Sequence, residues 1–161
     1  ILSDPDWRRG IGAIRNRDLA CELEVFSTQL SDFVPVAAAL PDIQFILPVM
    51  GWPIDTSGTG RAAWKRDLTA LADRENVAVK IFGLECIFGV DWTADEVRPW
   101  ILETIETFGS QRCMFASHMP ITRLAGGMRR LYQAYFDVIG AFSPSEKRQL
   151  LHDTAARVYR L

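Results

Sequence analysis

The sequence predicts an α/β fold of four strand–helix units that follow one another along 161 residues. The first observation behind it is that short apolar strands alternate with segments that have helical caps and helically spaced apolar side chains. The second is that residues 44–47 form a nearly continuous apolar run, which is typical of strands buried on both faces of a parallel sheet. Alternation of strands and helices implies parallel pairing through right-handed crossovers.

The four expected strands differ in how clearly the sequence marks them. They are residues 19–26, 44–47, 77–82 and 113–116. The third is the clearest, because a run of branched apolar residues is closed by Gly83. We expect all four to lie in one parallel sheet.

The helices are placed by their capping residues. Asp4 precedes Pro5 at the start of the first helix, and Ser31 is the expected N-cap of a helix that runs to about residue 40. Another helix is expected over about residues 61–74. Capping boxes then mark two later starts, at Thr93 with Glu96 and at Ser143 with Glu146. The helix after Thr93 should end at Gly109, and one further helix precedes Ser143.

Composition and charge exclude several classes of function. Hydrophobic residues make up 48% and charged residues 24%, so the chain has the composition of a globular protein. The net charge is −2 without a basic stripe, which argues against nucleic acid as a partner. No apolar stretch approaches the length of a membrane span. The three cysteines are far apart without a C-x-x-C pair, which favours a reducing, cytoplasmic location.

Several short motifs, weak singly but specific in combination, point to one family. They are Asp4-Pro5, residues 7–10, Pro41-Asp42, Gly51-x-Pro53, residues 76–81, Gly83-Leu84, residues 112–117 and residues 155–161. Together they resemble the amidohydrolase-related hydrolases, and in particular the branch of lactone hydrolases that contains fuconolactonase and 2-pyrone-4,6-dicarboxylate hydrolase. The resemblance spans nearly the whole chain. It implies a distorted TIM barrel whose later half, about the last four βα units, is supplied by this chain as a single domain over residues 1–161.

The length and the first residue fit this reading. A complete eight-unit barrel needs roughly 200–250 residues, and this chain begins with Ile1 instead of methionine. Four units would also leave two parallel edges, at the first and last strands, that a closed barrel pairs. We therefore expect the chain to be part of a longer protein.

Three positions depart from the family pattern, and all of them are strand ends. The family usually has histidine where this chain has Val49, serine where it has Phe82, and an acidic or amide residue where it has His118. The family's His-x-His pair on the first barrel strand has no counterpart here. Barrel enzymes carry their chemistry at the C-terminal ends of strands, so these departures argue against an unchanged family reaction.

His118 is the main catalytic candidate, because an imidazole just after a barrel strand can accept a proton from water or bind a metal. The alternative is a histidine that only forms a hydrogen bond within a loop. A Cys86–His118 dyad is a weaker hypothesis. His152, between two helices, is expected to be structural. Two histidines cannot build a multi-ligand metal site, so no metal ligand is assigned, although a divalent metal is compatible with the complete family fold.

Candidate substrate contacts follow the first, second and last strands. They are Gln29, Trp52 and Arg123, of which Arg123 is suited to bind a substrate carboxylate. For Trp52, packing under a loop is the competing interpretation. Glu85 is expected to be a solvated loop carboxylate without a partner.

Lys80 is expected to have a structural role. Strand alternation places Ala78, Lys80 and Phe82 on one face, and the branched residues of the other face suit the helical layer. Lys80 should therefore point into the barrel, where a buried ammonium needs an anion from Glu22 or Glu24.

These observations favour a hydrolase that attacks a lactone or a related small carboxylated substrate with activated water. A non-catalytic relative that binds a small ligand or a protein partner is the alternative, favoured by Val49 and Phe82. An independent open α/β domain is a third reading, but neither a G-x-G-x-x-G motif nor a P-loop supports nucleotide binding. The expected partner is a small molecule, and a homo-oligomer is compatible with the sequence.

Overall fold

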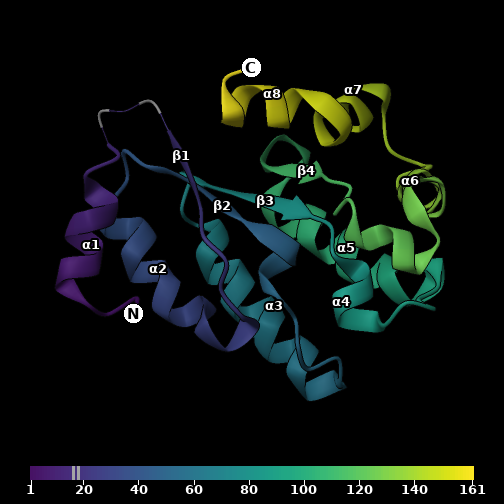
Figure 1. Ribbon diagram of the computed structural model, residues 1–161, viewed down its shortest axis with the longest axis horizontal. Coiled ribbons are helices and arrows are strands. Elements are labelled where there is room, and N and C mark those ends of the chain that lie inside the picture. The colour runs from purple at the N-terminus through teal and green to yellow at the C-terminus, as the bar shows by residue number, and fades with distance from the viewer. Residues whose placement is uncertain (16, 18) are drawn as a thin grey trace.

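The computed structural model describes residues 1–15, 17 and 19–161, and its centre is a four-stranded sheet. The strands are β1 (Ala20–Glu22), β2 (Gln44–Leu47), β3 (Val77–Ile81) and β4 (Cys113–Phe115). They lie side by side in chain order, and every neighbouring pair is parallel. The predicted parallel α/β fold is therefore confirmed (Figure 1).

Eight α-helices have been assigned in the described residues. They are α1 (Pro5–Gly12), α2 (Leu30–Ala39), α3 (Gly58–Ala72), α4 (Leu84–Phe88), α5 (Ala94–Phe108), α6 (Gly127–Val138), α7 (Pro144–Arg148) and α8 (Thr154–Tyr159). Short 3-10 turns η1 (Ser27–Gln29), η2 (Pro48–Gly51), η3 (Ser110–Arg112) and η4 (Ile121–Ala125) connect them, and a π-helical turn, η5 (Gln149–Asp153), joins α7 to α8. The short helix α4 was not predicted.

Most of the predicted helix starts are correct. The capping boxes at Thr93 and at Ser143 are both present, and the Asp4 carboxylate caps α1. The expected Ser31 cap is wrong, because α2 begins at Leu30 and Ser31 lies inside the helix. Because the chain is already helical in η1, Ser31 does not stand at the start of a helix and cannot act as its N-cap.

Strand β1 is shorter than predicted, and its partner explains why. Residues 20–22 pair with residues 44–46 of β2, and the Leu23 N–H donates to the Ile46 carbonyl at 3.0 Å. Strand β2 ends at Leu47 and turns into η2, so residues beyond Leu23 have no strand to pair with. β3 likewise ends at Ile81, one residue earlier than expected.

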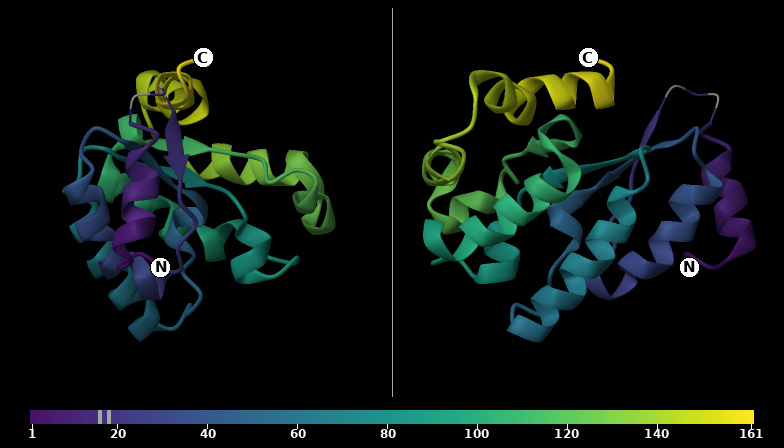
Figure 2. Two further views of the ribbon diagram at one scale, coloured as in Figure 1. Left: turned by 60° about the vertical axis from the view of Figure 1, so that its left-hand side comes forward. Right: turned by 180° about the vertical axis from the view of Figure 1, so that it is seen from behind.

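The two faces of the sheet are covered differently. Helices α2, α3 and α5 cover one face, and the segment from α7 to α8 lies over the other, as all three views show (Figures 1 and 2). We call these the outer and inner faces. Phe45, Leu47 and Val79 belong to the large core under the outer helices. On the inner face, Val158 of α8 packs against a small cluster formed by Ile46, Ala78 and Met114.

The predicted alternation of β3 is confirmed by this arrangement. Val77, Val79 and Ile81 pack into the outer core, while Ala78 belongs to the inner cluster. Lys80 points to the inner face, where its ammonium lies 2.6 Å from a carboxylate oxygen of Glu22. Glu22 is thus the partner, and the Tyr159 hydroxyl completes the cluster at 3.1 Å from the Lys80 nitrogen.

Among the described residues, no helix is long and apolar enough to span a membrane.

Candidate functional site

The carboxyl ends of β3 and β4 bring together a histidine and a glutamate. His118 follows β4 by three residues, and Glu85 is the second residue of α4, directly after the β3 end. Since β3 and β4 are parallel neighbours, the segments after them meet at one edge of the sheet. The His118 Nδ1 lies 2.7 Å from Glu85 Oε1, which is the distance of a strong, charge-assisted hydrogen bond.

This pair is shielded from solvent on the glutamate side. The Glu85 side chain is 3% exposed and the His118 side chain 18% exposed. Glu85 Oε2 is buried and forms no hydrogen bond with the described residues. A buried carboxylate with one unpaired oxygen is costly, so its bond to His118 is the main interaction that compensates its loss of water.

Glu85 was missed by sequence reasoning, which expected a solvated carboxylate without a partner. The reason is that His118, the partner of Glu85, is 33 residues away in sequence and becomes its neighbour only when β3 and β4 pair. The one available signal was that both residues follow adjacent strands of a predicted parallel sheet.

Apolar groups form the wall around the imidazole. The rings of Phe82 and His118 meet edge to face with centroids 5.1 Å apart. Gly83 has a φ of +70°, and a Cβ there would lie 3.2 Å from Val49 Cγ2 and 3.7 Å from His118 Nδ1. Glycine is thus favoured both by the left-handed backbone and by the close approach of Val49. Val49 and Phe82, two of the strand-end departures, therefore lie beside the third, His118.

The backbone after β2 adopts an unusual conformation. Val49, Met50, Gly51 and Trp52 have φ values of 51°, 55°, 74° and 45°, so four consecutive residues are left-handed. Each non-glycine residue in this region costs about 1–3 kcal/mol, and a β-branched valine is especially disfavoured. The turn is buried, and the Trp64 indole N–H donates to the Met50 carbonyl at 2.8 Å. Surrounding packing therefore holds a strained turn at a strand end.

The three predicted substrate contacts are not hydrogen-bonded to His118 in the described structure. Gln29 Oε1 accepts the Phe26 N–H at 3.0 Å and so acts as a local cap. Trp52 contacts the Phe26 ring edge to face at 5.7 Å, and its indole N–H is buried without a partner among the described residues. Arg123 is exposed in η4.

The structure also bears on the hypothetical Cys86–His118 dyad and on the expected structural role of His152. Cys86 forms no hydrogen bond with His118 within the described residues, and its thiol pKa is raised, first by burial and then by the carboxylates of Glu85 and Glu24. A raised pKa keeps the thiol protonated, which works against a nucleophilic role. His152 is exposed and pairs with Asp153 at 2.9 Å, on the helical surface.

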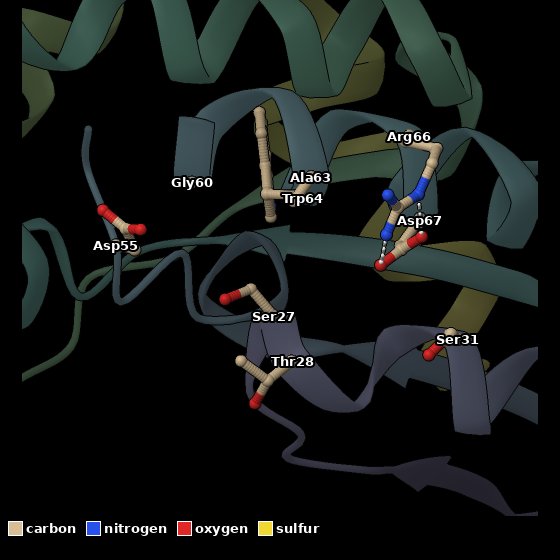
Figure 3. Close-up of a pocket in the computed structure, with 9 residues that line it drawn as sticks. All are labelled: Ser27, Thr28, Ser31, Asp55, Gly60, Ala63, Trp64, Arg66 and Asp67. Atoms are coloured by element: carbon tan, nitrogen blue, oxygen red, sulfur yellow. Dashed lines mark hydrogen bonds and ion pairs between the residues drawn. The ribbon is translucent and has the colours of Figure 1, made fainter. Parts of the chain in front are cut away.

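A cavity of about 310 Å³ lies elsewhere, between η1, α2 and α3 (Figure 3). Ser27, Thr28 and Ser31 line one side, and Asp55 and the paired Arg66 and Asp67 line the other. None of its lining residues belongs to the surroundings of His118. Its charged side chains already have partners: Asp55 accepts the Ser57 N–H at 2.9 Å, and Arg66 pairs with Asp67.

The described residues do not fit a metal centre by themselves. His118 and Glu85 meet, but no group of three or more histidine, cysteine or acidic side chains converges anywhere in the described ranges. A protein zinc site usually takes at least three such ligands.

Four parallel βα units that pair in chain order are the arrangement found in TIM-barrel-type α/β proteins. The chain belongs to the amidohydrolase family, whose model matches residues 1–161. Among curated proteins, it is 34% identical over 161 residues to the uncharacterized protein y4mH of Sinorhizobium fredii, covering all of this chain and 54% of that protein. It is 28% identical over 175 residues to an L-fucono-1,5-lactonase of Burkholderia multivorans, covering all of this chain and 58% of the lactonase.

Solved structures agree with this family. An amidohydrolase from Burkholderia multivorans with bound zinc superimposes with a TM-score of 0.91 at 26% identity, over 99% of this chain and 59% of that one. A probable 2-pyrone-4,6-dicarboxylic acid hydrolase from Acinetobacter baumannii, with citric acid bound, gives a TM-score of 0.80 at 14% identity, over 100% of this chain and 60% of that one, and shows the fold alone. The resemblance seen in the motifs is confirmed. The chain spans about half the length of the curated relatives it matches.

Proposed function

We propose that this chain forms the later half of the barrel of a hydrolase that opens a lactone or a related small carboxylated substrate with activated water. The amidohydrolase family and a relative named as an L-fucono-1,5-lactonase support the reaction class. The strand-end position of the candidate base supports the site.

One observation carries the proposal. His118 lies at the strand-end edge with one ring nitrogen held by Glu85 at 2.7 Å and 18% of its side chain exposed. The other nitrogen, Nε2, is then the one that accepts a proton from water. The hydroxide attacks the lactone carbonyl carbon, the ring C–O bond breaks, and the imidazolium returns the proton to the leaving oxygen. The product is an open-chain hydroxy acid.

Substrate contacts belong to the same proposal. Arg123 is exposed in the segment after β4, and its guanidinium is suited to bind a substrate carboxylate. Trp52 follows β2 and Gln29 follows β1. We propose that both border the substrate site beside His118, where the Gln29 amide nitrogen would donate a hydrogen bond to the substrate. A divalent metal in the complete protein would need ligands from outside the described residues.

A second candidate function is a non-catalytic protein that binds a small ligand. Val49 and Phe82 favour it, because they place apolar groups at two strand ends beside His118. Such a pocket would hold a ligand without supplying further polar groups to a reaction.

The test uses the full-length protein with L-fucono-1,5-lactone and, separately, 2-pyrone-4,6-dicarboxylate. Ring opening releases acid, which a pH indicator measures continuously. We expect turnover of at least one lactone well above the spontaneous rate. Calorimetry on the same samples separates the two functions: binding of a lactone without turnover would contradict the hydrolase and support the ligand-binding protein.

A further inference from the structure

We infer that Glu85 is a positioning residue that fixes the tautomer of His118 so that Nε2 carries the lone pair. This inference rests on the proposed function, in which His118 is the base. Glu85 touches neither water nor substrate in this role; it acts through the imidazole.

The chemistry of the contact sets the tautomer. An ionised carboxylate only accepts hydrogen bonds, so Glu85 Oε1 at 2.7 Å requires a proton on His118 Nδ1. In the neutral imidazole, the lone pair is then on Nε2, on the opposite side of the ring. Without the carboxylate, either nitrogen could carry the proton, and a fraction of the molecules would have no base at Nε2.

Burial strengthens the effect of Glu85 on the tautomer of His118. The Glu85 side chain is 3% exposed, so water does not compete for Oε1 as it does at a surface pair. The other carboxylate oxygen has no hydrogen-bond partner in the described part of the chain. The carboxylate therefore has one strong interaction available, and that interaction is with the ring nitrogen of His118.

The imidazole ring has two further neighbours. Phe82 meets the imidazole edge to face with centroids 5.1 Å apart, and a Cβ at Gly83 would lie 3.7 Å from Nδ1. A ring flipped about the Cβ–Cγ bond would exchange Nδ1 with Cδ2, and the hydrogen bond to Glu85 would be lost. The wall beside the ring restricts this exchange, so orientation and tautomer are fixed together.

The surface offers a matched comparison in the same chain. His152 Nδ1 and Asp153 Oδ1 are 2.9 Å apart, but the two side chains are 75% and 38% exposed. The residue types and the contact are similar, while burial differs. Changing Asp153 therefore controls for the loss of a histidine–carboxylate contact as such.

The decisive experiment is a double-mutant cycle for lactone hydrolysis in the full-length protein. Glu85→Gln should lower turnover about 10- to 100-fold when position 118 is histidine. With His118→Asp, the residue at 118 is a carboxylate that Glu85 repels, so Glu85→Gln should then leave turnover unchanged or raise it. Asp153→Asn should have no effect in either background. Equal losses from Glu85→Gln in both backgrounds would overturn the inference and make Glu85 merely structural.

A spectroscopic readout separates this inference from the proposed function. Nitrogen-15 NMR of the His118 ring should show a protonated Nδ1 and an unprotonated Nε2 in the native protein, and a mixture of tautomers after Glu85→Leu. If this change occurs while no lactone is hydrolysed, the positioning stands and the hydrolase falls. If hydrolysis depends on His118 but the ring signals do not respond to Glu85→Leu, Glu85 is not the positioning residue.

Discussion

Replacing His118 with alanine in the full-length protein should lower lactone turnover about 100-fold or more. The imidazole is the one histidine that the structure places at the strand-end edge. Of the described residues beside it, Val49 and Phe82 have no group that accepts a proton, and the Glu85 carboxylate is buried against Nδ1. A loss of this size reflects removal of a general base. The measurement is the initial rate of acid release at saturating substrate, compared with native protein.

His152→Ala is the matched control for this prediction. His152 is exposed and pairs only with a surface carboxylate among its described contacts. Its removal should leave turnover unchanged within about twofold. If His118→Ala also turned over at the native rate, His118 would be reduced to a loop residue, and the proposed base would have to come from another part of the protein.

Removing the Lys80 ammonium should destabilise the fold by about 2 kcal/mol. Lys80 Nζ lies 2.6 Å from Glu22 Oε1, and the Tyr159 hydroxyl lies 3.0 Å from Glu22 Oε2. The loss expected for a fully buried pair is about 3–5 kcal/mol, but here the side chains of Lys80 and Glu22 are 18% and 37% exposed. Solvent therefore compensates part of the broken pair, and the smaller value is expected.

Urea unfolding of the full-length protein measures this effect. Lys80→Met should lower the free energy of unfolding, and adding Glu22→Leu should restore part of it, because no uncompensated carboxylate is left. Lys65→Met is the control: Lys65 pairs with Glu103 at 3.1 Å but is 52% exposed, so its loss should cost under about 1 kcal/mol. An additive double mutant at positions 80 and 22 would show that the two charges do not interact.

The pH dependence of the Lys80 contribution follows from its pKa. Burial alone would lower the pKa of Lys80, but hydrogen bonds to Glu22 and Tyr159 outweigh burial, and the net shift is upward. A raised pKa means that the folded state holds the proton more tightly than the unfolded state. The contribution is therefore complete below the unfolded lysine pKa of about 10.4 and is lost as pH rises through the folded value. The difference between native protein and Lys80→Met should shrink only in strong alkali.

The sequence predicted what short-range rules control. The inward direction of Lys80 follows from alternation along β3, and the starts of α5 and α7 follow from capping residues three positions apart. Each of these depends on residues close together in the chain. The Ser31 cap was wrong for a related reason, because an unpredicted 3-10 turn begins the helical segment at Ser27.

The site was predicted only in part, because its contacts are long-range. His118 could be predicted as a site residue because it follows a strand. Its contact with Glu85, however, forms only when β3 pairs with β4. The cap formed by Gln29 depends on the direction of one amide group, which spacing does not define. Pattern rules locate an edge of the sheet where side chains gather, but they do not say which of those side chains touch.

The left-handed turn after β2 has a consequence for how this protein can change over generations. Its shape is held in part by buried neighbours such as Trp64, whose indole N–H donates to the Met50 carbonyl. Valine is poorly suited to a φ of 51°, whereas asparagine or histidine tolerates it better. The turn therefore imposes no backbone preference for an apolar residue there. Histidine or asparagine at position 49 would therefore relieve backbone strain and place a polar group beside His118, but its side chain would be buried and would need a hydrogen-bond partner there.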